Sequence, residues 1–276
     1  MDGRLGLKPL ADSQASLRLE WAAETATEAG KLLLGRFRSG LKAEEKESGI
    51  VTALDREAEE LIASRLAKTF PEDGLLSEEG AARPSTSGWK WIVDPLDGTT
   101  NYVTGLPFFG TSMACFDDEG AALGVVHAPA FDETFTSLAG MGAMGPTGPL
   151  ATSKAKTLKK SVFLVNKAYY PPDLVWKAAG GLLNSIRAFR VLGCVSLDLV
   201  QVAAGRVDGI VLFPSPSWDL AAGVAILQEA GAAVGFLGWE TEGRLKVLDA
   251  DPGPAERTGI IACPPSIFSV AVAALG

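Results

Sequence analysis

Two stretches near the start of the chain carry apolar residues at the spacing of an amphipathic helix. The first runs from about Ala15 to Phe37, and its apolar residues lie three and four positions apart: Leu19, Ala22, Ala23, Ala26, Leu33 and Phe37. The second follows Ile50–Asp55 and is stopped by Pro71, with the apolar face Ala58, Leu61, Ile62, Leu66 and Phe70. Each pattern predicts a helix that covers a core with one face. The charged run Lys42–Glu47 between them is predicted to be a solvated loop.

Strand patterns follow in the next part of the chain. Trp89–Val93 is apolar and is expected to end at the Asp94-Pro95 step. Gly110–Phe116 and Ala121–His127 flank a short polar turn, which predicts a hairpin. Thr134–Leu138 is the expected third strand of the same group.

The rest of the chain alternates strands with helices. Expected strands are Ser161–Val165, Ala188–Leu192 and Val207–Phe213, with short ones near Val234, Leu245 and Ile260. Expected helices are Asp173–Asn184, Val195–Ala204 and Trp218–Glu229. The segment Ala139–Leu150 contains four Gly and two Pro and is predicted to be a loop or linker. We therefore expect an α+β N-terminal half over residues 1–150 and an α/β C-terminal half over residues 151–276.

The composition is that of a globular chain of 276 residues, with 47% apolar and 21% charged residues. Its formal net charge of −8 disfavours binding to nucleic acid or an anionic membrane, because both need an excess of Lys and Arg. The start of the chain does not read as a signal peptide, and no apolar stretch reaches the ~20 residues of a membrane span. The three Cys form no CxxC pair, so we expect reduced thiols in a soluble cytoplasmic protein.

The sequence contains a single His, which excludes several kinds of catalytic site. His127 alone cannot build a His-rich zinc or di-iron site, and its surroundings do not resemble a nucleophile elbow. A packed histidine is the expectation for this apolar segment. Any catalytic groups are therefore expected to be carboxylates and hydroxyls.

The strongest chemical signal is the segment Trp91–Asn101, which reads WIVDPLDGTTN. Asp94 and Asp97 follow an apolar strand, and the proline and glycine beside them favour a tight bend that turns both carboxylates into one cleft. The amides of Gly98 and Thr99 are placed to face an anion, and carboxylates beside such a nest suit Mg²⁺. A turn without a ligand is the alternative. The spacing of the two carboxylates differs from the Asp-x-Asp of haloacid-dehalogenase-type phosphatases, which favours attack by water.

This segment resembles the signature of the inositol monophosphatase family, the lithium-sensitive, magnesium-dependent sugar phosphatases. Three further segments agree in order and distance: Val51–Asp55, Leu76–Gly80, and Trp218–Gly223 followed by Gln228–Gly231. Each also has a simpler interpretation, since Thr52-x-x-Asp55 is a helix capping box, Glu78-Glu79 a solvated pair and Asp219 a favourable charge at a helix start. Their joint occurrence with the central segment favours the resemblance.

The resemblance implies a layered αβαβα fold, a homodimer, and two to three Mg²⁺ ions for which Mn²⁺ can substitute. Glu78, Asp94 and the backbone carbonyl of Leu96 are expected to hold the first ion. Asp94 would bridge to a second ion, completed by Asp97 and Asp219. A third, weaker ion would rest on Glu78 and water, and Li⁺ is expected to inhibit.

The resemblance also implies catalytic roles. Thr99, with Asp55 behind it, is expected to orient or deprotonate the water that attacks phosphorus, and Glu78 is expected to assist as a catalytic carboxylate. The amides of Gly98 and Thr99 would hold the phosphate. Two metal ions about 3.5–4 Å apart stabilise both the attacking and the leaving oxygen of an in-line displacement, so that no histidine base is required.

Contacts with a small phosphorylated substrate are implied for Asp97, Gly98, Thr99, Gly193, Cys194, Val195, Leu212 and Asp219. Inositol-selective members usually carry a Glu where this chain has Leu212, so we expect no strong preference for inositol phosphate. Fructose-1,6-bisphosphatase, nucleotide 3′-phosphatase and histidinol-phosphatase activities on the same scaffold are the alternatives. A weakly catalytic regulatory protein that binds the RNA machinery is the alternative from another class.

Overall fold

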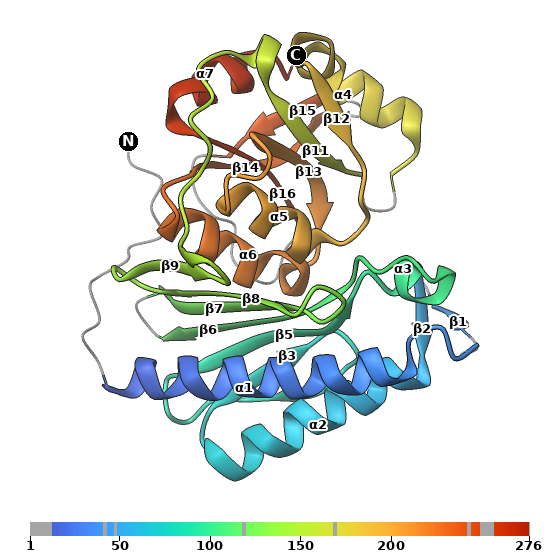
Figure 1. The fold of residues 1–276 in the computed structure, drawn as a ribbon, viewed down its shortest axis with the longest axis vertical. Coiled ribbons are helices and arrows are strands. Elements are labelled where there is room, and N and C mark those ends of the chain that lie inside the picture. The colour runs from blue at the N-terminus through green and yellow to red at the C-terminus, as the bar shows by residue number, and fades with distance from the viewer. Residues whose placement is uncertain are drawn as a thin grey trace.

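The computed structural model describes residues 13–40, 43–46, 49–117, 120–167, 170–241, 244–248 and 257–275. Its helices are α1 (Ser13–Arg36), α2 (Ala53–Thr69), α3 (Thr99–Thr104), α4 (Pro172–Ser185), α5 (Val195–Ala203), α6 (Ser217–Glu229) and α7 (Pro265–Ala273). They alternate with two large sheets in five layers (Figure 1). Helices α1 and α2 cover the outer face of the first sheet, α5 and α6 lie between the sheets, and α4 and α7 cover the second sheet from outside. The expected αβαβα layering is confirmed.

The first sheet has eight strands in the order β10-β9-β8-β7-β6-β5-β3-β4. The strands are β3 (Gly74–Ser77), β4 (Ala82–Arg83), β5 (Lys90–Asp97), β6 (Gly110–Asp117), β7 (Gly120–Ala128), β8 (Glu133–Leu138), β9 (Gly142–Gly145) and β10 (Gly148–Pro149). β3 and β5 run parallel, whereas the other neighbours run antiparallel. The predicted hairpin of β6 and β7, with β8 beside it, is confirmed.

Three local predictions for this half are wrong. Ala43–Lys46, within the charged run expected to be a loop, forms strand β1, because it pairs with the apolar β2 (Gly49–Thr52) and pairing outweighs low strand propensity. The ends of that run, Lys42 and Glu47, lie outside the described residues. Strand β5 continues past the Asp94-Pro95 step to Asp97, since an irregular register frees the proline from the ladder. The glycine-rich segment 139–150 contains β9 and β10, which extend the sheet edge as a hairpin.

The second sheet has six strands in the order β12-β11-β13-β16-β14-β15. The strands are β11 (Val162–Asn166), β12 (Ala188–Arg190), β13 (Gly209–Ser215), β14 (Ala233–Thr241), β15 (Arg244–Val247) and β16 (Thr258–Cys263). β12, β11 and β13 run parallel and are connected through α4 and α5, as the predicted alternation requires. The remaining pairs are antiparallel, and α7 is a helix that the sequence pattern did not indicate.

The central core joins the two sheets. One cluster packs Val126 and Phe135 of the first sheet, Leu199 of α5, Ile226 of α6 and Ile260 of the second sheet. The two halves therefore share a core, and we propose residue 150, between β10 and β11, as the boundary between them. Among the described residues, none of the helices combines the length and the hydropathy that crossing a membrane would require.

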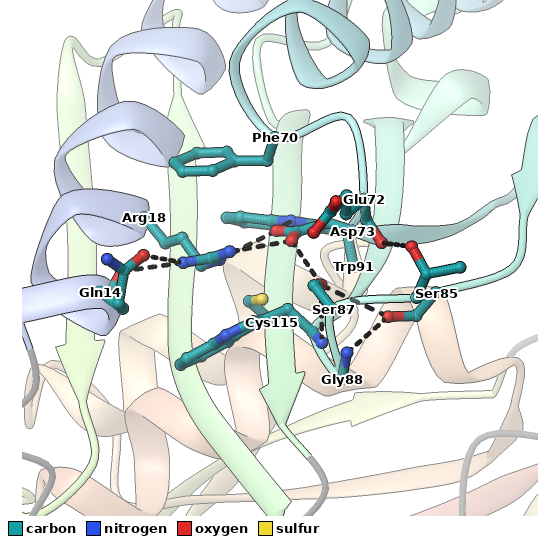
Figure 2. Close-up of polar contacts among 12 residues, drawn as sticks. Gln14, Arg18, Phe70, Glu72, Asp73, Ser85, Ser87, Gly88, Trp91 and Cys115 are labelled. Carbon is teal, nitrogen blue, oxygen red and sulfur yellow. Dashed lines mark hydrogen bonds and ion pairs between the residues drawn. The ribbon is translucent and has the colours of Figure 1, made fainter.

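A buried ion pair ties α1 to the segment before β3 (Figure 2). Arg18 donates from Nε and Nη2 to Asp73 Oδ2 and Oδ1, at 2.9 and 2.8 Å. Two more donors reach the same carboxylate: Trp91 Nε1 at 3.0 Å and Ser87 Oγ at 2.8 Å. The guanidinium also lies over the rings of Phe70 and Trp89, 4.5 and 4.3 Å from their centroids. Because Arg18 and Asp73 are only 5% and 1% exposed, this pair holds the first helix layer from inside the protein.

Candidate active site

Carboxyl groups from three elements gather at the end of β5. Asp94 is buried, and the amide of Leu96 donates to its Oδ1 at 3.0 Å. Burial raises the pKa of Asp94 well above its usual value, and the charges of Glu78, Asp97 and Asp219 raise it further. Glu78 follows β3, Asp97 ends β5, and Asp219 lies in the first turn of α6. The structure thus brings together the four carboxylates that the sequence analysis singled out.

This carboxylate cluster fits a hard divalent cation by its chemistry. Like charges crowded in a buried space are unfavourable unless protons or cations neutralise them. Carboxylate and carbonyl oxygens are the ligands that Mg²⁺ prefers. Within the described residues, no group of three or more His, Cys, Asp or Glu side chains is arranged so that it could hold a metal ion as it stands, so binding would require these carboxylates to move closer together. Glu78 and Asp219 are half-buried, so both residues are partly exposed to solvent.

Asp55 caps α2 and also contacts Thr99. Its Oδ2 accepts from the amide and the hydroxyl of Thr52, at 2.8 and 2.5 Å, which closes the capping box. Its Oδ1 accepts from Thr99 Oγ1 at 3.2 Å, and the same hydroxyl lies 3.1 Å from Leu96 O. Burial raises the pKa of Asp55, although hydrogen bonds from Thr52 and Thr99 oppose the shift. The cap and the contact with Thr99 coexist because they use different oxygens.

Asp97 is held by residues of the second half of the chain. Its Oδ2 accepts from the amide of Ser196 at 2.5 Å and from the thiol of Cys194 at 3.1 Å. Both donors stand at the start of α5. Burial raises the pKa of Asp97, while the hydrogen bonds from Ser196 and Cys194 lower it. The start of α5 therefore fixes a carboxylate that belongs to the first half of the chain.

Gly98 makes the turn from β5 into the short helix α3. Its φ of 85° lies in the left-handed region, and a Cβ there would stand 3.1 Å from Cys194 Cβ. Asn101 of α3 donates from Nδ2 to Leu192 O at 2.8 Å. This bond holds the segment before Gly193 close to the turn, so the structure brings Gly193 near the amides expected to bind phosphate.

Three side chains expected to contact the substrate are buried in the central core. Cys194, Val195 and Leu212 are 0%, 5% and 0% exposed, and all three belong to the cluster between the two sheets. Leu212 lies on β13 and packs there among other apolar side chains instead of lining an open surface. Its contact with a substrate stays a prediction, and such a contact would require this part of the cluster to open.

Several residues that shape the site had no clear signal in the sequence. Ser112 on β6 donates from Oγ to Trp218 O at 3.4 Å, which ties the first sheet to the turn that carries Asp219. Asp198 on α5 is fully buried, and Asn166 Nδ2 donates to its Oδ2 at 3.1 Å. Burial raises the pKa of Asp198 well above its usual value. A charged residue inside the apolar run of α5 is the one local sign that could have pointed to it.

His127 is a packed histidine, as predicted. It is 3% exposed on β7, and its Nδ1 lies 2.9 Å from Thr134 Oγ1 on the neighbouring strand. Burial lowers the pKa of His127, which favours the neutral ring. The imidazole therefore has a structural role, in which it packs against the neighbouring strand.

The chain is similar to one known family along most of its length. The model of the inositol monophosphatase family matches residues 15–265. The chain is 35% identical over 223 residues to a fructose-1,6-bisphosphatase/inositol-1-monophosphatase of Thermotoga maritima, which covers 79% of this chain and 84% of that protein. It is 33% identical over 223 residues to the Nus factor SuhB of Escherichia coli K12, which covers 78% of this chain and 84% of that protein.

Solved structures with the same fold agree with these relatives. The extragenic suppressor protein suhB from Bartonella henselae superposes with a TM-score of 0.83 at 30% identity, covering 94% of this chain and 98% of that one. An IMPase from Thermotoga maritima superposes with a TM-score of 0.81 at 31% identity, covering 94% of this chain and 96% of that one.

Proposed function

The chain belongs to the inositol monophosphatase family, and we propose that it hydrolyses a small sugar or inositol-type phosphate with Mg²⁺ as cofactor. Membership of this family and the inositol monophosphatases among its relatives support phosphomonoesterase activity for this chain. One observation supports the metal part of the proposal above the others. The buried Asp94 lies within the electrostatic reach of three further carboxyl groups, an arrangement that a divalent cation would stabilise.

The proposed ligands supply oxygen atoms from both halves of the chain. Glu78, Asp94 and the Leu96 carbonyl would hold one Mg²⁺, while Asp94, Asp97 and Asp219 would hold a second. The Leu96 oxygen accepts from Thr99 and keeps a second lone pair for this purpose. A third and weaker ion would rest on Glu78. When bound, Mg²⁺ supplies positive charge for the phosphoryl oxygens and lowers the pKa of water.

Thr99 and Asp55 together can act as the base. The Thr99 hydroxyl has one proton and two adjacent acceptors, Asp55 Oδ1 and Leu96 O, so its lone pairs are left for a water molecule. As Thr99 accepts a proton from that water, its own proton can pass to Asp55, whose pKa is raised by burial. The Gly98 and Thr99 amides are proposed to hold the phosphate during this transfer.

The names of the relatives guide the choice of substrate. The Thermotoga maritima relative is named for activity on fructose 1,6-bisphosphate and inositol 1-phosphate, which supports a sugar or inositol phosphate over a nucleotide or histidinol phosphate. Other relatives are named Nus factor SuhB, so a regulatory role with the RNA machinery remains the alternative function from another class. The expectation that no nucleic acid is bound therefore stays a prediction.

We also propose a homodimer in the cytoplasm. The three cysteines, Cys115, Cys194 and Cys263, are free in the structure, which fits a reducing compartment. The homodimer rests on analogy with the family alone.

A phosphate-release screen tests the proposed function. Substrates are inositol 1-phosphate, fructose 1,6-bisphosphate, a nucleoside 3′,5′-bisphosphate and histidinol phosphate, each with Mg²⁺, Mn²⁺ or EDTA. We expect release from the first two with either metal, no release in EDTA, and inhibition by Li⁺. Full turnover in EDTA would contradict the metal mechanism. No release from any substrate, together with binding to RNA, would favour the alternative class.

A further inference from the structure

The Asp97 carboxylate is held by a thiol as well as by an amide. Cys194 Sγ lies 3.1 Å from Asp97 Oδ2 and 3.5 Å from the backbone oxygen of the same residue. The amide of Ser196 lies 2.5 Å from Oδ2. Cys194 is fully buried, so its S–H group has no contact with solvent and donates within the protein, to this carboxylate.

Both contacts converge on one carboxylate oxygen. Since two donors meet Oδ2, a rotation of the carboxylate away from this position breaks both hydrogen bonds. The donors stand at the start of α5, whose side chains are packed in the central core. The orientation of Asp97 is therefore set by a rigid segment that is 97 residues away along the chain.

We infer that Cys194 is a positioning residue, whose thiol fixes the Asp97 carboxylate in the orientation that Mg²⁺ binding needs. The inference rests on the proposed function, in which Asp97 is a Mg²⁺ ligand. It replaces the expectation that the Cys194 side chain contacts the substrate, because that side chain has no exposed surface. Groups that hydrogen-bond to a metal ligand commonly change metal affinity by about 10–100-fold when they are removed.

Three variants separate the thiol contact from packing. Cys194→Ala removes the donor, whereas Cys194→Ser keeps a donor at the same position. Cys263→Ala is the matched control, because Cys263 is also free and fully buried but packs on the outer side of the second sheet. Calorimetric titration measures Mg²⁺ affinity, and kinetics at saturating Mg²⁺ measure KM and kcat separately. Thermal unfolding shows that each variant is folded.

The expected result is a Mg²⁺ affinity about tenfold weaker or more in Cys194→Ala. Cys194→Ser should recover most of this loss, and Cys263→Ala should bind as the wild type does. The substrate KM of Cys194→Ala at saturating Mg²⁺ should change less than its Mg²⁺ affinity does, because the thiol acts through Asp97. If Cys194→Ala does not fold, Cys194→Val fills the space without a donor and must show the same weakened binding.

A folded donor-free variant with wild-type Mg²⁺ affinity overturns the inference. A raised substrate KM with unchanged Mg²⁺ affinity also overturns it and returns Cys194 to the substrate pocket. In both cases the wild type still binds Mg²⁺, so the proposed function stands. A wild type that binds no Mg²⁺ refutes the proposed function and this role of Cys194 with it.

Discussion

Replacing Asp73 by Asn tests whether the ion pair in Figure 2 holds α1 and α2 on the first sheet. Each oxygen of Asp73 accepts two hydrogen bonds: Oδ1 from Arg18 and Ser87, and Oδ2 from Arg18 and Trp91. Asn keeps one oxygen but replaces the other by an amino group, which cannot accept. Two donors therefore lose their acceptor, and the buried guanidinium of Arg18 loses its counter-charge.

The structure sets the size of this effect. Removing one partner of a buried ion pair costs about 3–5 kcal/mol, because the other charge stays buried without compensation. At about 2–4 °C per kcal/mol for a chain of this size, the expected drop in Tm is roughly 6–20 °C. The surface pair of Arg56 and Glu44 is the matched control, since its side chains are 56% and 67% exposed. Glu44→Gln makes the same acid-to-amide change and should cost less than about 1 kcal/mol.

Urea unfolding of four proteins measures the coupling: wild type, Asp73→Asn, Arg18→Met and the double variant. The double variant should lose less stability than the sum of the single variants, by about 0.5–3 kcal/mol, because the amide introduced by Asp73→Asn then no longer faces an unpaired guanidinium. Strictly additive losses, or an Asp73→Asn cost no larger than that of Glu44→Gln, would refute the argument.

Three further predictions concern other parts of the structure. Asp55→Asn should lower kcat more than it lowers Mg²⁺ affinity, because Asp55 contacts Thr99. Kinetics measure the first quantity and calorimetry the second, and a loss of Mg²⁺ affinity equal to that of Asp94→Asn would contradict the prediction. Leu212→Glu should lower Tm, because it buries a carboxylate in the central core, whereas Leu212→Met should cost less than about 1.5 kcal/mol. A Leu212→Glu protein with the Tm of the wild type would contradict this, and kinetics on inositol 1-phosphate then test the predicted contact with the substrate. Burial holds the pKa of His127 below its ordinary value of 6.5, so its stabilising contribution is present above pH 6.5 and is lost as the pH falls below it. Between pH 7.5 and pH 5.5, urea unfolding should show a smaller loss of stability for His127→Gln than for the wild type. Equal losses of stability would contradict this.

Sequence periodicity was sufficient where a segment's environment follows from its own pattern. The helices α1 and α2, the β6–β7 hairpin and the capping box at Asp55 all follow from residues that are neighbours along the chain. The αβαβα layering followed from the resemblance, which carries information about packing that no local pattern contains. It also added Glu78 and Asp219 to the Asp94 and Asp97 of the central segment, although these two residues are 141 positions apart in sequence and approach Asp94 only through the fold.

Contacts between distant segments were beyond the reach of the sequence. Nothing near Asp97 indicates that Cys194 and Ser196 hold it, because the packing of α5 alone brings them together. The charged segment Ala43–Lys46 and the glycine-rich segment 139–150 read as loops, but both become strands where a neighbouring strand offers its backbone. In each case the deciding energy comes from a partner that the local sequence does not contain.

The central claim is that the carboxylate cluster at Asp94 binds Mg²⁺ for phosphate-ester hydrolysis. Calorimetric Mg²⁺ titration of the wild type, Asp94→Asn and Glu133→Gln tests it most directly, since Glu133 is an acid paired with Arg206 away from the cluster. We predict that Asp94→Asn lowers Mg²⁺ affinity by at least about tenfold and abolishes phosphate release, while Glu133→Gln matches the wild type. Mg²⁺ affinity in Asp94→Asn equal to that of the wild type would contradict the account.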